Sequence, residues 1–302
     1  MLAADGLRKS YGSVDAVKSV SLAVQSGQML ALLGPNGAGK TTTIRMLVGL
    51  TPKDSGTIDY TDANGQQHDQ LPSAEIGYLP EERGLYVERP VLEGLVYFGQ
   101  IRGMSASAAA TSAQHWLERF ELWDRRDDKV QTLSKGNQQK VQFISAVVHG
   151  PRIAIIDEPF SGFDPLNQER MLRFLKELRD EGMAIVFSAH QMDLVQRLAD
   201  DIILMASGEV VAAGKFEEIS AQSGCSATIE ARYDTRIDRS AVVNAPGEFD
   251  LDGDRIQLRP GAGHDLNEAL TWLGDVGRIV SINARQPSLH EIYLEIAGAA
   301  SP

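Results

Sequence analysis

An apolar run followed at once by a glycine-rich loop is the feature that most constrains this sequence. Residues 29–33 read MLALL, Gly34–Thr41 reads GPNGAGKT, and the helical pattern TTIRML comes next. This order predicts a buried strand, a tight loop and a helix that begins near Lys40. The loop has the form G-x-x-x-x-G-K-T, in which glycine leaves backbone N–H groups free to surround an anion. We expect it to bind the phosphates of a purine nucleoside triphosphate; a glycine-rich turn without a ligand is the alternative.

Two side chains at the end of this loop have the chemistry that a triphosphate needs. The Lys40 ammonium is expected to reach the β- and γ-phosphates, and the Thr41 hydroxyl to hold Mg²⁺. The helix that starts here directs the positive end of its dipole toward the same anion. The loop alone therefore predicts a nucleotide site, but not yet a reaction.

Length, charge and cysteine content limit the kind of protein. The 302 residues suit one large or two ordinary domains. The net charge of −12 argues against a nucleic-acid partner, which would favour a basic face. Cys225 is the only cysteine, which excludes an intramolecular disulfide, suits a reducing cytoplasm and is most simply an ordinary packing residue.

Membrane segments are not predicted. The sequence has no run of about 18 apolar residues, and its start has no basic segment followed by an apolar stretch. If the protein serves a membrane process, we expect another chain to supply the membrane-spanning part.

Periodicity before about Gly214 predicts a mixed α/β order. Val14–Val24 alternates apolar and polar residues before a turn. Strands that are apolar on both faces, as in a covered parallel sheet, are predicted at Ile153–Ile156 and Met183–Phe187. The other predicted elements are a mainly helical stretch at about 82–148, a helix at Ala106–Phe120, a helix with Asp164 as N-cap and Pro165 at its first position, and a hairpin at Ile202–Val211 around Ser207–Gly208.

The remaining segment differs in character. Strand-like pieces occur at Ser226–Ile229, Arg255–Leu258 and Arg278–Ile282, and helical ones at Leu266–Leu273 and from Pro287 onward. This mixture predicts a small α+β domain.

A buried strand that ends in two acids indicates a reaction at the loop. Asp157 and Glu158 follow the apolar run, and burial of acids without a partner is costly. We expect Asp157 to hold Mg²⁺ through water beside Thr41, and Glu158 to polarise the water that attacks the γ-phosphate. An acidic strand end that caps a nearby helix is the alternative.

The segment Leu133–Lys140, LSKGNQQK, places a serine and a glycine at a helix start shortly before this strand. It resembles the LSGGQ signature of ATP-binding cassette (ABC) ATPases, which closes over the γ-phosphate of nucleotide bound to a second subunit. The resemblance assigns that contact to Ser134 and Gly136. Lys135 and Asn137 depart from the pattern, and Lys135 either adds a cation near the phosphates or faces solvent. Taken without its neighbours, the segment also fits a serine-capped polar helix start.

Three further positions match the ABC pattern. His190, in the segment FSAH, resembles the switch histidine that contacts the γ-phosphate. Ser161–Asp164, SGFD, resembles the D-loop that crosses the dimer interface. Tyr11 is predicted to precede the first strand pair, where the family stacks an aromatic ring on adenine; a packing tyrosine is the alternative.

A narrower resemblance points to one exporter branch. Tyr78–Tyr86, YLPEERGLY, resembles the sodium- and antibiotic-extrusion ATPases, and the tail Pro287–Leu294 resembles their accessory C-terminal domain. Glu81 stands where the family usually has glutamine, at the position that joins the metal site to the permease-docking surface. A glutamate oxygen can still ligate Mg²⁺.

The ABC resemblance covers about residues 1–215 and implies a fold, an activity and partners. The fold is α/β: a P-loop NTPase of the ABC ATPase type at 1–215, with a mixed sheet and a helical subdomain at about 82–148, followed by a small α+β domain at 216–302. The activity is ATP hydrolysis with Mg²⁺, which drives a separate integral-membrane permease of an exporter, docked near Glu81–Arg102. Two copies, most simply a homodimer, close on ATP at the cytoplasmic face of the cell membrane, without nucleic acid.

The implied site residues fall into five groups. The nucleotide-binding residues are Tyr11, Gly34, Pro35, Asn36, Gly37, Ala38, Gly39, Lys40, Thr41 and Thr42. The others are the catalytic Glu158 and His190, the Mg²⁺ ligands Thr41, Asp157 and Glu81, the signature contacts Ser134 and Gly136 made across the dimer, and the interface residue Asp164.

Other functions share parts of this pattern. A soluble ABC ATPase that acts on ribosomes or DNA would usually carry two cassettes or a long coiled coil, and the stretch between Lys40 and Ser134 is short and has no sustained heptads. Another phosphate-loop enzyme, such as a kinase or GTPase, would not have the signature segment. A dinucleotide oxidoreductase would need G-x-G-x-x-G. The exporter ATPase accounts for all of the motifs together.

Overall fold

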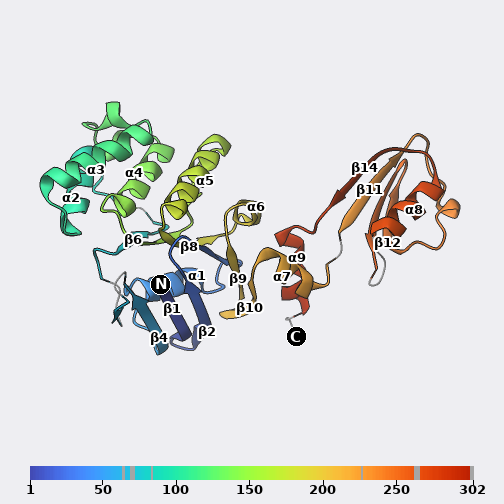
Figure 1. Cartoon of the computed structure of the whole chain (residues 1–302), viewed down its shortest axis with the longest axis horizontal. Helices are drawn as coiled ribbons and strands as arrows, with labels where there is room; N and C mark the ends of the chain where they lie inside the picture. The colour runs from blue at the N-terminus through green and yellow to red at the C-terminus, as the bar shows by residue number, and fades with distance from the viewer. Residues whose placement is uncertain (63–64, 69–71, 83, 226, 262–265, 300–302) are drawn as a thin grey trace. The chain divides into compact units, whose positions relative to one another are not determined.

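The computed structural model describes residues 1–302 except 63–64, 69–71, 83, 226, 262–265 and 300–302. The chain divides into two compact units, Met1–Phe216 and Glu217–Pro302 (Figure 1). Each unit has its own sheet and its own cluster of buried apolar side chains.

The first unit is built on a mixed sheet with the strand order β5-β4-β1-β2-β10-β9-β3-β8-β7-β6. Strands β6, β7, β8, β3 and β9 are paired in parallel, whereas β1 pairs antiparallel with β2 and β4. Every residue of β3, β7 and β8 is buried, which explains why their sequences are apolar on both faces apart from Asp157 and Ser188. The strands are β1 (Leu2–Tyr11), β2 (Val14–Val24), β3 (Met29–Leu33), β4 (Ser55–Thr61), β5 (Gln67–His68), β6 (Ile76–Leu79), β7 (Ile153–Asp157), β8 (Ala184–Ala189), β9 (Asp201–Ala206) and β10 (Glu209–Gly214).

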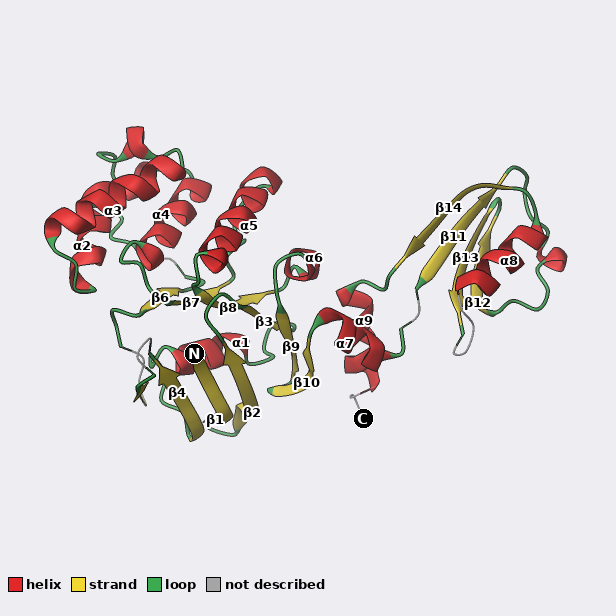
Figure 2. Ribbon diagram, viewed as in Figure 1, coloured by secondary structure: helices red, strands yellow, loops and turns green. Residues whose placement is uncertain are grey.

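Helix α1 (Lys40–Leu47) lies between the antiparallel strands and the parallel part of the sheet (Figure 2). Its Ile44 and Met46 belong to the same buried cluster as Leu7 of β1, Ile155 of β7 and Val186 of β8. Fully burying an aliphatic side chain of this size contributes about 1.5–3 kcal/mol. The helix that follows the glycine-rich loop is thus held on both sides, which fixes the loop in place.

Three helices, α2 (Val91–Ile101), α3 (Ala106–Arg119) and α4 (Lys135–Val147), gather in a separate helical part of this unit (Figure 1). Short 3₁₀ turns at Trp123–Arg125 and Val130–Thr132 connect α3 to α4. Aromatic packing joins this part to α5 (Pro165–Asp180), because Phe120 stacks on Phe174 with ring centroids 4.2 Å apart. The short helix α6 (Met192–Gln196) follows β8.

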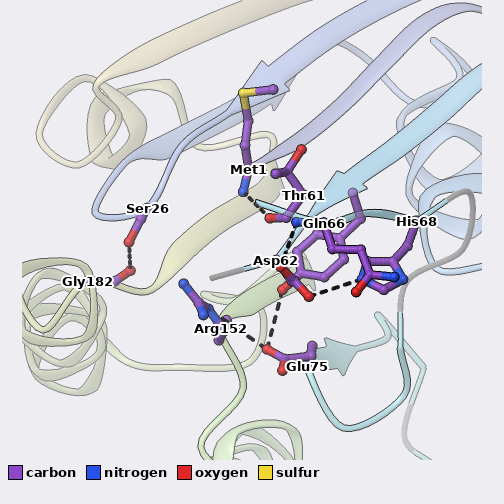
Figure 3. Close-up of polar contacts among 10 residues, drawn as sticks. Met1, Ser26, Thr61, Asp62, Gln66, His68, Glu75, Arg152 and Gly182 are labelled. Atoms are coloured by element: carbon purple, nitrogen blue, oxygen red, sulfur yellow. Dashed lines mark hydrogen bonds and ion pairs between the residues drawn. The ribbon is translucent and has the colours of Figure 1, made fainter. Parts of the chain in front are cut away.

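Polar contacts tie chain segments of the first unit that are far apart in sequence (Figure 3). The amino group of Met1 donates to the Thr61 carbonyl at 2.9 Å, and the Tyr60 hydroxyl donates to Glu75 Oε2 at 3.3 Å. The Ser26 hydroxyl donates to the Gly182 carbonyl at 2.6 Å. The first bond joins the start of β1 to the end of β4, and the other two fasten β4 and the turn before β3 to segments beside the parallel strands.

The second unit has an antiparallel sheet in the order β12-β13-β11-β14. One face of this sheet packs on α8, where Ile229, Ala231 and Ile256 meet Ala269 and Leu273. The elements of this unit are α7 (Phe216–Ser223), β11 (Thr228–Tyr233), a 3₁₀ turn (Arg239–Ala241), β12 (Gly247–Asp252), β13 (Arg255–Pro260), α8 (Leu266–Val276), β14 (Ile279–Arg285) and α9 (Leu289–Ala299).

Most predicted elements are confirmed within two residues, including the strand at Val14–Val24 and the helix capped by Asp164. The hairpin around Ser207–Gly208 is also present, but it ends at Gly214, three residues after the predicted Val211. One placement is wrong: Tyr11 does not precede the first strand pair but is the last residue of β1, paired with Val14. The prediction missed β5, β6, α6, α7 and β12, and the last helix begins at Leu289 instead of Pro287. Ser226 and Arg83, which fall inside predicted segments, lie outside the described residues.

Candidate active site

The carboxyl ends of three neighbouring parallel strands position the site. Leu33 at the end of β3 pairs with Ala189 of β8, and Asp157 of β7 pairs with Ser188 of β8. Ligand sites of open parallel sheets form at this edge, because the loops that leave adjacent strands meet there. The glycine-rich loop, Glu158 and His190 therefore emerge side by side.

A cavity of about 1250 Å³ opens at this edge and contains most of the predicted site residues. Its lining includes Tyr11 from β1, Glu81 after β6, Glu158 after β7 and His190 after β8. The glycine-rich loop contributes Asn36, Gly37, Ala38, Gly39, Lys40, Thr41 and Thr42. Residues far apart in the sequence thus line one cavity.

Glycine is required at position 39 by both backbone and space. Gly39 has φ 98°, a conformation that residues with a Cβ rarely adopt. A Cβ there would lie 2.5 Å from the carbonyl oxygen of Ala16. The strand β2 and the start of α1 can approach this closely only with glycine between them.

The Lys40 side chain is folded onto its own loop. Its Nζ donates to the carbonyl of Gly34 at 2.6 Å and to that of Pro35 at 3.1 Å. Burial lowers the pKa of Lys40, while the carboxylates of Glu158, Asp157 and Glu81 act in the opposite direction. The ammonium thus lies among three acids and two carbonyls, an environment in which it can exchange carbonyl oxygens for phosphate oxygens.

Asp157 has the chemistry of a metal partner. It is 1 % exposed, its Oδ1 accepts a hydrogen bond from the Ser188 hydroxyl, and its Oδ2 is buried with no partner among the described residues. A buried carboxylate oxygen without a partner is costly, so a cation beside it would stabilise the site. Thr41 and Glu81 line the adjoining cavity, which fits the donor set of Mg²⁺.

The protein donors do not form a complete metal site by themselves. Within the described residues, no three His, Cys, Asp or Glu side chains are grouped as a metal ion would require. Mg²⁺ usually keeps water and phosphate ligands in nucleotide sites instead of an all-protein cage. The arrangement around Asp157 agrees with that second kind of site.

Glu158 and His190 are paired across the cavity. Nδ1 of His190 lies 2.8 Å from Oε2 of Glu158, and the carboxylate is mostly buried while the imidazole is mostly exposed. Glu158 has φ 55°, and such a left-handed conformation in a non-glycine residue costs about 1–3 kcal/mol. Its N–H donates to the Ser188 hydroxyl at 3.1 Å, which holds this backbone turn.

Tyr11 and Glu81 enter the cavity from its other sides. Tyr11 is 51 % exposed and lines the cavity, and Lys9 Nζ lies 5.5 Å from the centroid of its ring. Glu81 is exposed, and the carbonyls on either side of it, those of Pro80 and Glu82, accept hydrogen bonds from Gln142 Nε2 at 3.0 and 3.1 Å. Stacking of adenine on Tyr11 stays a prediction.

Six predicted residues are absent from the cavity lining, namely Gly34, Pro35, Asp157, Ser134, Gly136 and Asp164. Ser134 is the N-cap of α4 and accepts a hydrogen bond from the Asn137 N–H at 3.3 Å, and Gly136 lies in the first turn of the same helix. Asp164 caps α5, and the hydrogen bonds that it accepts from Asn167 lower its pKa. The contacts expected of Ser134, Gly136 and Asp164 are with a second subunit, and these contacts stay a prediction.

Two functional candidates were missed by the sequence argument. Ser188 contacts both acids, although the sequence argument used its segment only for His190. Gln142 is 2 % exposed and holds the backbone around Glu81. A serine inside an apolar strand and a glutamine on the buried face of a helix were the available signals, since buried polar groups require partners.

Comparison with known proteins agrees with this geometry. The family model described as ABC transporter matches residues 17–161. The uncharacterized ABC transporter ATP-binding protein YhaQ of Bacillus subtilis is 40% identical over 99% of this chain and 99% of its own length. The linearmycin resistance ATP-binding protein LnrL of the same organism is 29% identical over 99% of this chain and 98% of its own length.

Solved structures share the architecture of the first unit. The dimeric structure of a bacterial ABC transporter cassette superposes with a TM-score of 0.64 and 26% sequence identity. The match covers 71% of this chain and 98% of that cassette. The likeness therefore concerns the first unit, whereas the two Bacillus relatives match along both units.

Proposed function

The chain belongs to the ATP-binding proteins of ABC transporters, and on this basis we propose how its residues bind and hydrolyse ATP and which partners it needs. It is the ATP-binding and ATP-hydrolysing subunit of an ABC exporter. The alternative of a soluble ABC ATPase on ribosomes or DNA is not favoured, because the related proteins are transporter subunits and the chain carries a net charge of −12.

The single observation that carries the proposal is the cavity that joins the glycine-rich loop to the acidic strand end. Tyr11, Lys40 and Glu158 are far apart in the sequence, and folding brings them together to line one cavity. In our proposal the adenine stacks on Tyr11, and the loop N–H groups and Lys40 surround the phosphates. Glu158 and His190, which line the same cavity, would face the γ-phosphate.

The chemistry follows from the two side chains that are paired in the free chain. Glu158 accepts a proton from the attacking water, an effect that typically contributes about 10²–10⁴-fold. His190, now 2.8 Å from Glu158, holds the carboxylate in place and can donate to a phosphate oxygen. Lys40 leaves the Gly34 and Pro35 carbonyls to neutralise the phosphate charge.

The second requirement is a divalent cation. Asp157, Thr41 and Glu81 would hold Mg²⁺, which neutralises charge on the β- and γ-phosphates when bound. The unpartnered Oδ2 of Asp157 supports this assignment. Asp157 orients the donor set from the strand end, and Glu81 brings the loop after β6 to the same place.

A second copy of the chain is the third requirement. ABC ATPases form dimers, and we propose that Ser134 and Gly136 of each copy complete the nucleotide site of the other. This explains why neither residue lines the cavity of its own chain. In such a dimer Asp164, at the start of α5, lies at the shared interface.

Mixed variants test the shared site. Lys40→Ala and Ser134→Ala should each abolish hydrolysis when alone. When the two are mixed and allowed to exchange subunits, activity should return, because one of the two sites then has an intact Lys40 and an intact Ser134. If mixing restores nothing although mass spectrometry detects mixed dimers, the shared-site proposal is wrong.

The fourth requirement is a separate membrane permease. Among the described residues no helix is long and apolar enough to cross a membrane. Tyr86, Tyr97 and Ile101, at or beside α2, are exposed large hydrophobic residues at 53, 45 and 52 %. We propose that the permease docks here, near Glu81, and holds the subunit at the cytoplasmic membrane face; purified complexes with Tyr97→Glu should then contain less permease than complexes with the native chain.

A further inference from the structure

We propose that Ser188 is a positioning residue for both acids of the active site, and that its hydroxyl sets the affinity for the divalent cation that accompanies the nucleotide. The inference rests on the nucleotide site proposed above. It concerns the carboxyl end of β8, where Ser188 is the second-last residue and does not line the cavity.

The Ser188 hydroxyl on β8 bonds to two consecutive residues at the end of β7. Ser188 is 0 % exposed, and its O–H donates to Oδ1 of Asp157 on the neighbouring strand β7. The same oxygen accepts the N–H of Glu158 at 3.1 Å. Both hydrogen-bonding roles of the serine are therefore used, and both partners are acids of the site.

The bond to Asp157 decides which carboxylate oxygen is free. Because Oδ1 is occupied by Ser188, only Oδ2 is left without a partner in the described part of the chain. A hydrogen-bond donor behind a metal-binding carboxylate fixes its orientation, and loss of such a donor typically weakens metal binding about 10–100-fold. Ser188 has that position relative to Asp157.

The bond to Glu158 acts on the backbone. Glu158 follows β7 in a left-handed conformation, with φ 55°, and the Ser188 oxygen holds its N–H. This turn directs the side chain into the cavity, where Oε2 meets His190. Within the described residues, the Ser188 oxygen is the acceptor that restrains this N–H.

Packing alone does not explain a serine here. The residues on either side of it, Phe187 and Ala189, are buried and apolar, as are Ile155 and Ile156 on the adjacent strand. An alanine would fill nearly the same space, whereas a buried hydroxyl is costly unless it is hydrogen-bonded. The hydroxyl is therefore retained for its bonds to the acids.

The test is a metal titration that does not depend on turnover. The ADP-loaded protein is titrated with Mn²⁺, and bound metal is followed by electron paramagnetic resonance. Ser188→Ala should weaken Mn²⁺ binding roughly tenfold, as for loss of other such donors, while ADP binding without metal stays within about twofold of the native value. Ser188→Thr keeps the hydroxyl and should restore most of the affinity.

A matched control separates positioning from general destabilisation. Ser112→Ala also removes a single hydroxyl. In the native protein this hydroxyl donates to the Val148 carbonyl at 2.6 Å and not to Asp157 or Glu158. This variant should bind Mn²⁺ like the native protein. If Ser188→Ala does not fold, the same titration on Ser188→Cys, which keeps size but donates weakly, decides the question.

Each result bears on the proposal. Native Mn²⁺ affinity in Ser188→Ala, or an equal loss in Ser112→Ala, would overturn the role of Ser188. A native protein that does not bind ADP would instead overturn the nucleotide site on which the inference rests. The two failures are thus distinguished by the ADP measurement.

Discussion

The side chain of Gln142 anchors the loop around Glu81, and the effect of replacing it can be worked out from the structure. Gln142, on α4, is 2 % exposed, and its Nε2 donates to the carbonyls of Pro80 and Glu82. Its Oε1 is buried with no partner among the described atoms. The same side chain therefore stabilises the loop through two bonds and carries one unsatisfied acceptor.

For Gln142→Leu these terms nearly cancel. The variant loses two hydrogen bonds, each with a net contribution of about 1 kcal/mol to stability. It also removes the buried unsatisfied acceptor, which costs the native protein about 1–3 kcal/mol. We expect the free energy of unfolding to change by no more than about 1 kcal/mol, while Pro80–Glu82 loses its anchor. Stability and loop order should thus separate in this variant.

For Gln142→Glu the loss of the two hydrogen bonds and the burial of a charge both destabilise the protein. The new carboxylate would face the same two carbonyl oxygens with no donor, and a buried unpaired charge costs about 3–5 kcal/mol. Burial raises the pKa of such a carboxyl in the folded state, so the protonated form is favoured there. Stability is then retained at low pH and is lost as pH rises through the raised pKa.

The assay combines urea unfolding with hydrogen exchange of the Glu81 and Glu82 amides. Gln142→Leu should accelerate exchange at both amides at nearly native stability, and should raise the Mg²⁺ concentration that hydrolysis requires. Ser145→Ala is the control, because the Ser145 hydroxyl donates to the Gln142 carbonyl at 2.7 Å, a bond within α4. Native exchange at Glu81 and Glu82 in Gln142→Leu would refute the reasoning.

Two further predictions concern one acid in each unit. Glu158→Gln should bind ATP but lower hydrolysis about 10²–10⁴-fold, since an amide cannot accept the proton, and undiminished turnover in a phosphate-release assay would exclude Glu158 as the base. Hydrogen bonds from Arg285 and Ser288 lower the pKa of Glu291 from 4.5 to about 2. This contribution to stability is present above pH 4.5 and is lost as pH falls toward 2, so Glu291→Gln should flatten that acid dependence in hydrogen exchange of β13; an unchanged dependence would contradict it.

Local sequence patterns were sufficient wherever neighbouring residues decide the conformation. The loop before α1, the Asp164 cap with Pro165, and the apolar strands β7 and β8 each depend on a few consecutive residues. Chain periodicity predicted these elements because apolar faces must be buried at the period of a helix or a strand.

Some signals were present in the sequence and were not used. Ser288 and Glu291 form a capping box at the start of α9, with Ser288 N–H donating to Glu291 Oε2 at 2.9 Å. The spacing S-x-x-E marks such a start, and would have placed the helix at Leu289 instead of Pro287. β12 was harder to find, since its alternating pattern is short and half polar.

The sequence by itself determined that this chain has a phosphate-binding loop, an acidic strand end and a signature segment, because each is a short run with its own chemistry. Tertiary structure alone decided how they act together. The parallel pairing of β7 with β8 puts the Ser188 hydroxyl against Asp157 and Glu158, and α4 brings Gln142 to the loop of Glu81. Such contacts depend on strand register and helix packing between segments dozens of residues apart, which no local pattern encodes.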